Sequence, residues 1–384
     1  MERLLGVMKL STRVVSGGTH HPMMRPRVLR IAMVAPPYYP VPPDGYGGIE
    51  AVVAGLVDRL VARGHRVTLF AAGARGTAAQ EFVRTSERTM SGRLGEAIPE
   101  VVNAARVFGQ LRSRPVDIVH DHTIAGPLTA SGRAAPTLVT VHGSAAELAD
   151  VYRPLGRTVS LVAISHAQRA SEPGLNWVAT VHNGIDVRSF PYRSHKDDYV
   201  LFIGRFHPQK APHLAIEAAR RAGVRIILAG KCTEPVEHEY YRTKVAPLLG
   251  RDAVDVGIAD GAFKRRLLAG ARCLVFPICW AEPFGLVMVE AMAGGTPVVA
   301  LSAGSAPEVV AHGRTGFVVE RPEQLARAIT DCERLEPSDC RRLVSERFSL
   351  DAMAAAYERT YRRVLEHQLA QRPGGRLPQA RAGG

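Results

Sequence analysis

Two short apolar runs enclose the stretch of sequence that decides the fold, WAEPFGLVMVEAMAGGTP at residues 280–297. The runs cover residues 274–277 and 297–300, and both are predicted to be buried strands. The stretch between them opens with a Glu-Pro pair and closes with Gly-Gly. Proline favours the first position of a helix, and glycine the position after the last. The pattern therefore predicts a strand–helix–strand unit, with Glu282 at the start of the helix and Glu290 about two turns inside it.

The spacing of these two glutamates limits what they can do. At a rise of about 1.5 Å per residue they would lie about 12 Å apart along the helix, which is too far to share one proton. Two carboxylates at that separation suit different parts of one elongated ligand. A second interpretation stays open for Glu282, because an acidic residue at a helix start is favoured by the helix dipole and is a common cap.

The composition is that of a globular protein with room for two domains. The chain has 384 residues, of which 46% are hydrophobic, and its mean hydropathy of −0.02 excludes wholesale disorder. No run approaches the roughly 20 apolar residues of a membrane-spanning helix, and residues 1–28 lack the apolar core of a secretory signal. The five cysteines contain no C-x-x-C pair, so we expect reduced thiols and a cytoplasmic protein.

The net charge of +13 suggests three kinds of partner: nucleic acid, an anionic membrane surface or a phosphate-bearing small ligand. Nucleic acid is disfavoured because aromatic residues make up only 6% of the chain and do not interleave with basic stretches. Two alternatives stay open: a solvated basic surface, and weak peripheral contact with anionic lipid at the inner face of the plasma membrane.

Part of the charge lies at the two ends of the chain, which are rich in glycine and proline. We expect residues 1–28 to be a flexible basic extension and residues 371–384 to be a disordered tail. Met24 would begin a shorter chain that fits the fold better, so residues 1–23 are expected to be dispensable.

Strand-like apolar runs alternate with stretches of helical periodicity, first over residues 29–190 and again over residues 191–349. Such alternation predicts two α/β domains, each with a parallel sheet covered by helices on both faces. A last helix is expected over residues 350–370. The expected strands are 28–35, 65–70, 116–120, 137–141, 160–164 and 177–181 in the first domain, and 199–204, 224–230, 254–256, 274–277 and 297–300 in the second.

A cationic loop, GRFHPQK at residues 204–210, follows the first strand of the second domain. In open α/β sheets, ligands bind beyond the carboxyl ends of the strands. Gly204 permits close approach of a ligand to the backbone, while Arg205 and Lys210 can clamp a diphosphate from one loop. The alternative is a pair of surface cations with no ligand.

The first domain offers two candidates for the opposite wall of a cleft. Gly47 and Gly48 lie in the loop DGYGGIE at residues 44–50, whose backbone N–H groups could take an anionic oxygen at a helix start. The spacing does not match the G-x-G-x-x-G fingerprint, and a flexible loop is the alternative. His142 follows a predicted strand and is expected to face the same cleft.

The segment His120-Asp121-His122 ends another predicted strand and is expected in a similar place. Its residue types suggest a metal site. A metal site needs three or four convergent ligands, however, and no further cluster of ligands is evident in the sequence. We therefore expect no metal.

In this order, the motifs resemble those of the retaining glycosyltransferases with the GT-B fold in family four, the group of sucrose-phosphate synthases and bacterial mannosyl- and glucosyltransferases. The resemblance spans most of residues 29–350. It implies two Rossmann-like domains facing each other across a deep cleft, with the helix at 350–370 crossing back to the first domain. The segments that carry it are GGIE at 47–50, VHG at 141–143, HNGID at 182–186, Gly204-Arg205 with Lys210, EPFG at 282–285 with Glu290-Ala291, and GTPV at 295–298.

The resemblance also implies a role for each of these residues. Arg205 and Lys210 would hold the donor diphosphate and stabilise it as it leaves, and Glu290 would accept hydrogen bonds from the ribose hydroxyls. Glu282 would hold the transferred sugar together with nearby backbone N–H groups. The implied catalytic residues are Arg205, Lys210, Glu282 and His142, the implied donor-binding residues are Gly204, Phe284, Gly285, Leu286 and Glu290, and Gly47 and Gly48 would contact phosphate or acceptor.

The implied reaction moves a hexosyl group from a nucleotide-diphosphate sugar to an acceptor hydroxyl with retention of anomeric configuration. Fixed cations and dipoles would lower the barrier by stabilising the leaving diphosphate. No general base is evident, and the family is thought to use the donor phosphate for deprotonation, with no cofactor and no metal. One departure is AGKC at residues 229–232, where many relatives have AGxG. The donor base and sugar stay open, and so does the acceptor, which could be a sugar, a lipid-linked molecule or a small metabolite.

Three other functions are less favoured. An epimerase or phosphorylase of the same fold would act on sugar nucleotides or glycans without transfer to a separate acceptor. A Rossmann oxidoreductase is disfavoured because the sequence has no proper G-x-G-x-x-G unit. A catalytically silent binding protein is disfavoured by the complete set of donor residues.

Overall fold

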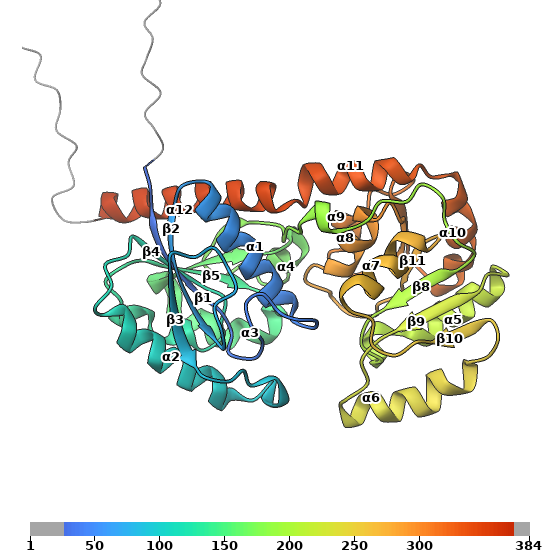
Figure 1. Cartoon of the computed structure of the whole chain (residues 1–384), viewed down its shortest axis with the longest axis horizontal. Helices are drawn as coiled ribbons and strands as arrows, with labels where there is room; N and C mark the ends of the chain where they lie inside the picture. Colours follow the sequence, from blue (N-terminus) through green and yellow to red (C-terminus); the bar gives the residue numbers. More distant parts are fainter. Residues whose placement is uncertain (1–26, 372–384) are drawn as a thin grey trace, which may run out of the picture.

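A computed structural model describes residues 27–371, in which two α/β domains lie side by side (Figure 1). The predicted basic extension and disordered tail fall almost wholly on residues 1–26 and 372–384, so these two predictions lie outside the described residues. Among the helices of residues 27–371, none is both long enough and apolar enough to cross a membrane.

The first domain is built on a seven-stranded parallel sheet with the strand order β3-β2-β1-β4-β5-β6-β7. Its strands are β1 (Arg30–Val34), β2 (Arg66–Ala72), β3 (Glu81–Ser86), β4 (Ile118–Asp121), β5 (Thr137–Val141), β6 (Val159–Ala163) and β7 (Trp177–Thr180). Its helices are α1 (Gly48–Ala62), α2 (Ala97–Leu111), α3 (Ala145–Tyr152) and α4 (His166–Ser171).

The second domain is built on a six-stranded parallel sheet with the strand order β10-β9-β8-β11-β12-β13. Its strands are β8 (Val200–Ile203), β9 (Ile226–Ala229), β10 (Ala253–Asp255), β11 (Leu274–Phe276), β12 (Val298–Leu301) and β13 (Gly316–Val319). The helices that follow are α5 (Pro212–Arg221), α6 (Pro235–Tyr240), α7 (Gly261–Gly270), α8 (Leu286–Ala293), α9 (Ala306–Val309), α10 (Leu325–Asp331), α11 (Pro337–Arg347) and α12 (Leu350–Gln371).

Both sheets change direction of winding at one point, between β1 and β4 in the first domain and between β8 and β11 in the second. In such sheets the loops that leave the two central strands run to opposite faces, which opens a crevice at the carboxyl ends of the strands. The loops after β1, β4, β8 and β11 are therefore the ones that the topology offers to a ligand. All of the segments predicted to bind donor or acceptor lie in or next to such loops, or after the neighbouring β5.

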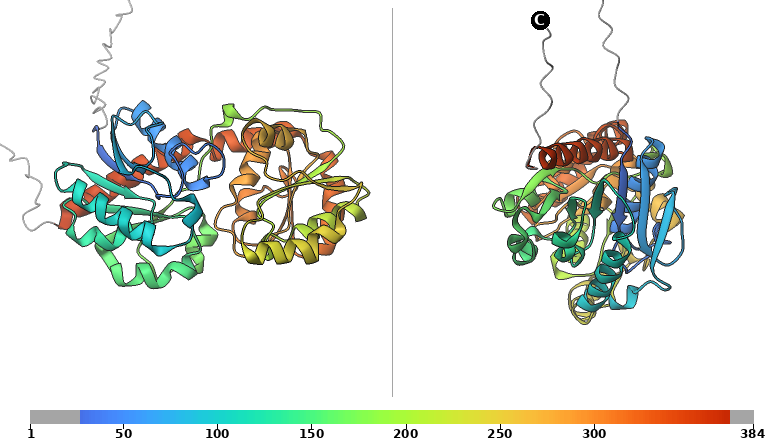
Figure 2. Two further views of the ribbon diagram at one scale, coloured as in Figure 1. Left: turned by 60° about the horizontal axis from the view of Figure 1, so that its bottom comes forward. Right: turned by 90° about the vertical axis from the view of Figure 1, so that its left-hand side faces the viewer.

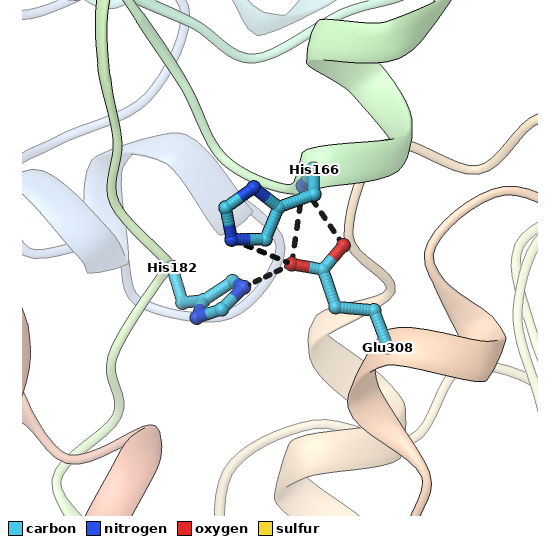
Figure 3. A group of neighbouring side chains, drawn as sticks. All are labelled: His166, His182 and Glu308. Atoms are coloured by element: carbon cyan, nitrogen blue, oxygen red, sulfur yellow. Dashed lines mark hydrogen bonds and ion pairs between the residues drawn. The ribbon is translucent and has the colours of Figure 1, made fainter.

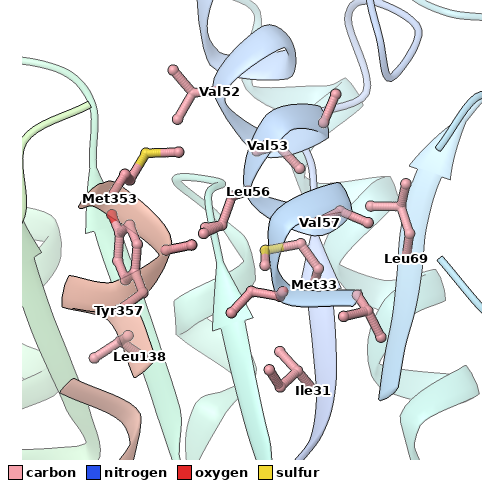
Figure 4. Packing of buried hydrophobic residues seen from close by; sticks show 14 of the residues in the cluster. Ile31, Met33, Val52, Val53, Leu56, Val57, Leu69, Leu138, Met353 and Tyr357 are labelled. Carbon is pink, nitrogen blue, oxygen red and sulfur yellow. The ribbon is translucent and has the colours of Figure 1, made fainter. Parts of the chain in front are cut away.

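Burial on both faces of the central strands explains their apolar sequences. Alternate side chains of β1 point to opposite faces, so Ile31 and Met33 pack with α1 and α12, while Ala32 and Val34 pack in a second cluster with Val107 of α2. Figure 4 shows Ile31 and Met33 beneath α1, with α12 beside them. The first domain therefore has an apolar core on each side of its sheet.

Helix α12 belongs to the end of the chain but packs against the first domain (Figures 1 and 2). Tyr357 and Tyr361 are fully buried there. The Tyr361 hydroxyl lies 2.7 Å from Nδ1 of His120, and the Tyr357 hydroxyl lies 2.8 Å from Oγ1 of Thr140. Two strands of the first sheet thus hold the C-terminal helix by hydrogen bonds as well as by packing.

Helix α8 begins later than predicted, at Leu286 instead of beside Pro283. Gly285 precedes it in the left-handed region with φ 73°, and Glu282 lies in the loop before the helix. Tertiary contacts explain the difference: a Cβ on Gly304 would lie only 2.4 Å from the backbone N and O of Glu282, so the two backbones pack too closely for this loop to coil. The prediction that Glu282 starts the helix is wrong, as are the capping interpretation and the 12 Å separation along the helix axis.

Strands β3 and β13 and helix α2 are among the elements of the structure that were not predicted from the sequence. Strand β3 lies at the edge of the first sheet and is half polar, so it lacks an apolar run. Helix α2 exposes Ile98 and Val101, which blurs its amphipathic pattern. Strand β13 is only four residues long, begins with Gly316, and lies at the edge of the second sheet.

Replacing Tyr361 with Ala should lower the free energy of unfolding by about 3–5 kcal/mol, because a fully buried ring is lost beneath α12. Tyr361→Phe removes only the hydrogen bond to His120 and should cost about 1 kcal/mol. Urea unfolding can be followed by the fluorescence of Trp177 and Trp280, which report on one domain each. Tyr192→Ala, at a half-exposed position, is the matched control, and an equal loss in Tyr192→Ala and Tyr361→Ala would contradict the docking role.

Candidate functional site

A cavity of about 840 Å³ lies between the two domains at the carboxyl ends of the strands. Its first-domain wall comes from the loops after β1, β4 and β5 and from α2 and α3, and its second-domain wall is the loop Glu282–Leu286. The predicted site residues that line it are Gly47, Gly48, His142, Glu282, Phe284, Gly285 and Leu286. The other predicted residues, Gly204, Arg205, Lys210 and Glu290, belong to the second domain but do not line this cavity.

Lys210 and Glu282 form an ion pair between the loops after β8 and β11. Both side chains are less than one-fifth exposed, at 17% and 13%, so their attraction is screened less than that of a surface pair. Trp280 contributes on both sides, because its indole N–H donates to the Glu282 carboxylate at 3.0 Å and its ring centroid lies 5.1 Å from Nζ of Lys210. The structure therefore brings together a cation and a carboxylate that were predicted from separate motifs.

Arg205 also follows β8, but its guanidinium pairs with two carboxylates near the start of α6. Its Nη1 atom lies 3.1 Å from Oε1 of Glu237 and 3.4 Å from Oε1 of Glu234. Burial of Glu237 raises the pKa of its carboxyl, but the backbone N–H groups of Thr233 and Glu234 and the charge of Arg205 outweigh burial and leave that pKa lowered. Glu234 and Glu237 were not predicted to be partners of Arg205.

Glu290 lies inside α8, as predicted, and pairs with a lysine that the sequence analysis did not single out. Nζ of Lys264, in α7, lies 2.6 Å from Oε2 of Glu290, and only 16% of the glutamate side chain is exposed. Lysine is rare in this chain. That rarity is the signal that could have marked Lys264.

The glycine-rich loop after β1 packs against the second domain. A Cβ on Gly48 would lie 3.3 Å from Cδ1 of Leu286, and the ring of Tyr46 lies 4.9 Å from Nζ of Lys231. Gly47 precedes α1 with φ 142°, and a Cβ there would lie 2.9 Å from Cβ of Pro43. These contacts from both domains hold the loop in place, which disfavours the flexible-loop interpretation.

His142 follows β5 and lines the cavity beside His122. Nε2 of His142 lies 2.9 Å from Nδ1 of His122, and the two rings stack with their centroids 5.2 Å apart. Burial lowers the pKa of His142 to about 4 and that of His122 well below its ordinary value, so both rings are neutral at pH 7. His142 can therefore offer a hydrogen bond to a ligand but not a positive charge.

The three residues His120, Asp121 and His122 do not converge on one site. Side chains of a strand alternate between its faces, so Asp121 is separated from the two histidines. Asp121 instead forms a buried ion pair of 2.9 Å with Arg133, and His120 hydrogen-bonds beneath α12 to Tyr361. The expectation that this segment faces the cleft is right for His122 and wrong for His120 and Asp121.

Two buried carboxyl groups line the first-domain wall of the cavity. Burial raises the pKa of Glu50, in the first turn of α1, to about 7. Burial also raises the pKa of Glu100, in α2, whose carboxylate accepts backbone N–H groups of Ile124 and Ala125 at 3.1 and 3.2 Å. The sequence analysis quoted Glu50 only as part of the GGIE segment, and it missed Glu100 because α2 itself was not predicted.

A separate polar cluster joins the domains at His166, His182 and Glu308 (Figure 3). The Glu308 carboxylate, from α9 of the second domain, pairs with Nε2 of His182 and accepts the backbone N–H groups of His166 and Ala167 at 2.8 and 3.3 Å. It thereby satisfies donors at the start of α4, which belongs to the first domain. The three side chains have residue types that bind metals, but the Glu308 oxygens are already engaged, so we interpret the cluster as a contact between domains.

Two family models match adjoining parts of the chain. Residues 46–189 match the model described as Glycosyltransferase Family 4, and residues 187–347 match the model described as Glycosyl transferases group 1. Together they cover residues 46–347, which include most of both domains and most of the residues that line the cavity.

The chain is also similar to individual proteins of known function or structure. A phosphatidyl-myo-inositol mannosyltransferase from Mycolicibacterium smegmatis is 29% identical over 326 residues, which cover 76% of this chain and 81% of that protein. The solved structure of AviGT4, a glycosyltransferase involved in avilamycin A biosynthesis, is 26% identical with a TM-score of 0.68, over 88% of this chain and 98% of AviGT4. HepE from Anabaena, solved in complex with UDP-glucose, is 20% identical with a TM-score of 0.65, over 90% and 100% of the two chains, and supports the fold alone.

Replacing Glu308 with Gln should lower the free energy of unfolding by about 1–3 kcal/mol at pH 7, because a charged acceptor of several donors is lost. Burial raises the pKa of Glu308, but the His182 and backbone hydrogen bonds outweigh burial and leave it lowered. A lowered carboxyl pKa contributes stability above the ordinary pKa of about 4.5, and this contribution is lost as the pH falls through the folded-state value.

The difference between the wild type and Glu308→Gln should therefore shrink between pH 7 and pH 3.5. Urea midpoints at the two pH values measure this difference. Glu346→Gln, at an exposed position in α11, should show little effect at either pH. If the stability difference between the wild type and Glu308→Gln stays constant with pH, the charge of the Glu308 carboxylate does not stabilise the contact between the domains.

Proposed function

The chain belongs to the family four glycosyltransferases with the GT-B fold, and we propose that it moves a hexosyl group from a nucleotide-diphosphate sugar to an acceptor hydroxyl with retention of anomeric configuration. One observation carries this proposal. The ion pair of Lys210 and Glu282 joins the loops after the two central strands of the second sheet, directly beside the cavity that both domains line. A donor lying across these loops would have its phosphates at the cation and its sugar at the carboxylate.

The proposed donor site extends from this pair along the second domain. Lys210 and Arg205 both follow β8 and would bind the diphosphate, and Gly204 would admit it close to the backbone. Gly230 supports this arrangement, because a Cβ there would lie only 2.0 Å from the carbonyl oxygen of Gly204. The departure noted at residues 229–232 therefore keeps the one glycine that the packing requires.

The transferred sugar is proposed to lie at the end of the cavity formed by the loop Glu282–Leu286. The Glu282 carboxylate would accept hydrogen bonds from sugar hydroxyls, and the backbone N–H groups at the start of α8 would face the developing negative charge. His142 would contact the sugar from the first domain as a neutral imidazole. Glu290 would accept the ribose hydroxyls further along α8.

Ion pairing gives the proposed site a means of binding phosphate without a large rearrangement of side chains. Lys210 is held by Glu282, and Lys264 is held by Glu290. A diphosphate that approaches Lys210 would share this cation with Glu282, and the carboxylate would then be oriented toward the sugar hydroxyls. The cations would stabilise the negative charge that grows on the diphosphate as the glycosidic bond breaks. We propose no metal and no organic cofactor in this step.

The setting of the reaction is also a proposal. We expect a cytoplasmic enzyme of bacterial glycoconjugate synthesis that acts on a nucleotide sugar and does not bind nucleic acid, with weak peripheral contact with anionic lipid. The mannosyltransferase relative named above acts, by its name, on phosphatidyl-myo-inositol. Product analysis separates transfer from the alternative epimerase or phosphorylase reactions, because only transfer joins the donor sugar to a second molecule and releases the nucleoside diphosphate.

Lys210→Ala and Glu290→Ala should each lower nucleotide-sugar binding or turnover at least tenfold, which corresponds to about 1.4 kcal/mol. Lys210 would lose its contact with the diphosphate, and Glu290 its contact with the ribose. Lys244→Ala, at an exposed position of the same domain, is the matched control and should keep wild-type activity. Wild-type activity in both site variants would show that the donor site has been assigned to the wrong residues.

Calorimetry with UDP-, GDP-, ADP- and dTDP-sugars should identify one preferred nucleotide. Binding should be lost in Lys210→Ala and retained in Lys244→Ala. UDP-glucose is the first donor to test, because a protein of the same fold has been solved with it. If none of the four nucleotide classes binds, the proposed donor class is wrong.

A further inference from the structure

The first-domain end of the cavity is largely apolar, and several of its polar side chains are already bonded within the protein. Leu94, Val101, Leu128, Leu148 and Val151 contribute hydrocarbon surface to the lining. Three polar residues beside them are occupied: the Tyr38 hydroxyl donates to the backbone carbonyl of Glu96, Thr123 bonds to Asp121, and Glu100 accepts two backbone N–H groups. This end of the cavity offers few free hydrogen-bonding groups to a polyhydroxylated acceptor.

The apolar lining continues onto the surface at the mouth of the cavity. Leu94, Val101, Ile124 and Leu128 all line the cavity, yet each is 45–57% exposed. Ile98 lies one turn of α2 from Val101 and is 59% exposed. Large exposed side chains of this kind are unfavourable in water, and their concentration around one opening marks a binding region for an apolar group.

The same cavity reaches the proposed catalytic loop at its other end. Glu282, His142 and Gly48 line that end, so a ligand filling the whole cavity would contact the sugar-binding residues and the apolar mouth at once. A ligand of this shape has a hydroxyl at one end and hydrocarbon at the other. Glu50 also lines the cavity, and burial raises the pKa of its carboxyl to about 7, so this group is about half protonated at pH 7.

We propose that the acceptor is an amphiphilic alcohol, whose hydroxyl-bearing head lies at Glu282 and His142 and whose aliphatic or aromatic body fills the cavity toward Leu94, Val101 and Leu128. This proposal rests on the proposed transferase function, since it assigns the acceptor class of the same site. A single acceptor molecule with an apolar body would occupy the cavity, because the apolar region is continuous with the loop Glu282–Leu286.

Binding of n-alkyl glucosides with methyl, butyl, hexyl and octyl chains tests the proposal, using calorimetry below the critical micelle concentration of each. Burial of each further methylene group should raise the affinity about fourfold until the cavity is filled. Leu128→Asp and Val101→Asp should each abolish this dependence on chain length, because a carboxylate would be desolvated beside the chain. Both positions are half exposed, so either substitution leaves the core of the domain intact.

The control variant is Val28→Asp, which also changes an exposed apolar residue. Val28 lies just before β1, at the amino end of that strand, whereas the cavity lies at the carboxyl ends of the strands. Val28→Asp should keep the full dependence on chain length. An affinity that does not change with chain length, or a dependence that survives in both cavity variants, would overturn the proposal.

Two further measurements separate the possible outcomes. Binding of the nucleotide sugar should be unchanged in Leu128→Asp. If the wild-type protein fails to bind nucleotide sugars, that result counts against the proposed function and not against the apolar acceptor. Flotation with phosphatidylcholine vesicles, with and without phosphatidylglycerol, distinguishes the source of the acceptor. Vesicle binding that is lost in Leu128→Asp supports a bilayer lipid, whereas chain-length dependence without vesicle binding supports a dissolved apolar alcohol.

Discussion

Parallel pairing of β8 with β11 places the loops after these two strands side by side, and the candidate site depends on that constraint. Lys210 comes from the loop after β8 and Glu282 from the loop after β11, so the two residues of this ion pair lie far apart in the sequence. Their pairing is reinforced by a backbone hydrogen bond of 2.9 Å from the N–H of Cys279 to the carbonyl of Gln209. Gly304 then packs against Glu282 so closely that only glycine fits. The shape of the loop Glu282–Leu286 is thus set by sheet topology and backbone packing, and helix propensity has little part in it.

The two domains are held together by contacts on more than one side of the cavity. Leu286 packs on the glycine-rich loop at Gly48, Glu308 satisfies donors at the start of α4, and α12 spans from the second domain to a buried seat on the first (Figures 1 and 3). These contacts differ in kind. Helix α12 packs on the first domain through an apolar core that also contains buried hydroxyl–imidazole and hydroxyl–hydroxyl hydrogen bonds. The Glu308 contact, by contrast, is polar and depends on charge. A chain organised in this way can keep its domains joined through α12 while the polar contact responds to solution conditions.

The electrostatic character of the cavity changes from one end to the other. In the second domain, Glu282 of the cavity lining pairs with Lys210, and outside the lining Lys264 pairs with Glu290 and Arg205 pairs with the buried Glu237. On the first-domain wall, burial keeps His142 and His122 neutral and raises the pKa of Glu50 and Glu100, and much of the remaining lining is hydrocarbon. Such a gradient suits a charged donor on one side and a weakly polar acceptor on the other. It also favours reaction at their meeting point, because fixed charges act most strongly where water is displaced.

Local sequence patterns predicted the two α/β domains, most of their central strands and the loops that meet at the cleft. These follow from periodicity and from glycine, proline and cation positions, which are local properties of the chain. Only the tertiary structure decided that Glu282 lies outside α8, that Lys264 and Glu237 are the partners of Glu290 and Arg205, and that His120 belongs to the seat of α12. The same holds for the apolar half of the cavity, whose wall includes α2, a helix that sequence patterns did not reveal. These cases share one cause. An ion pair, a close backbone approach or a cavity wall is formed by residues that are distant in sequence and that the sheet order brings together, and local sequence patterns do not encode such contacts.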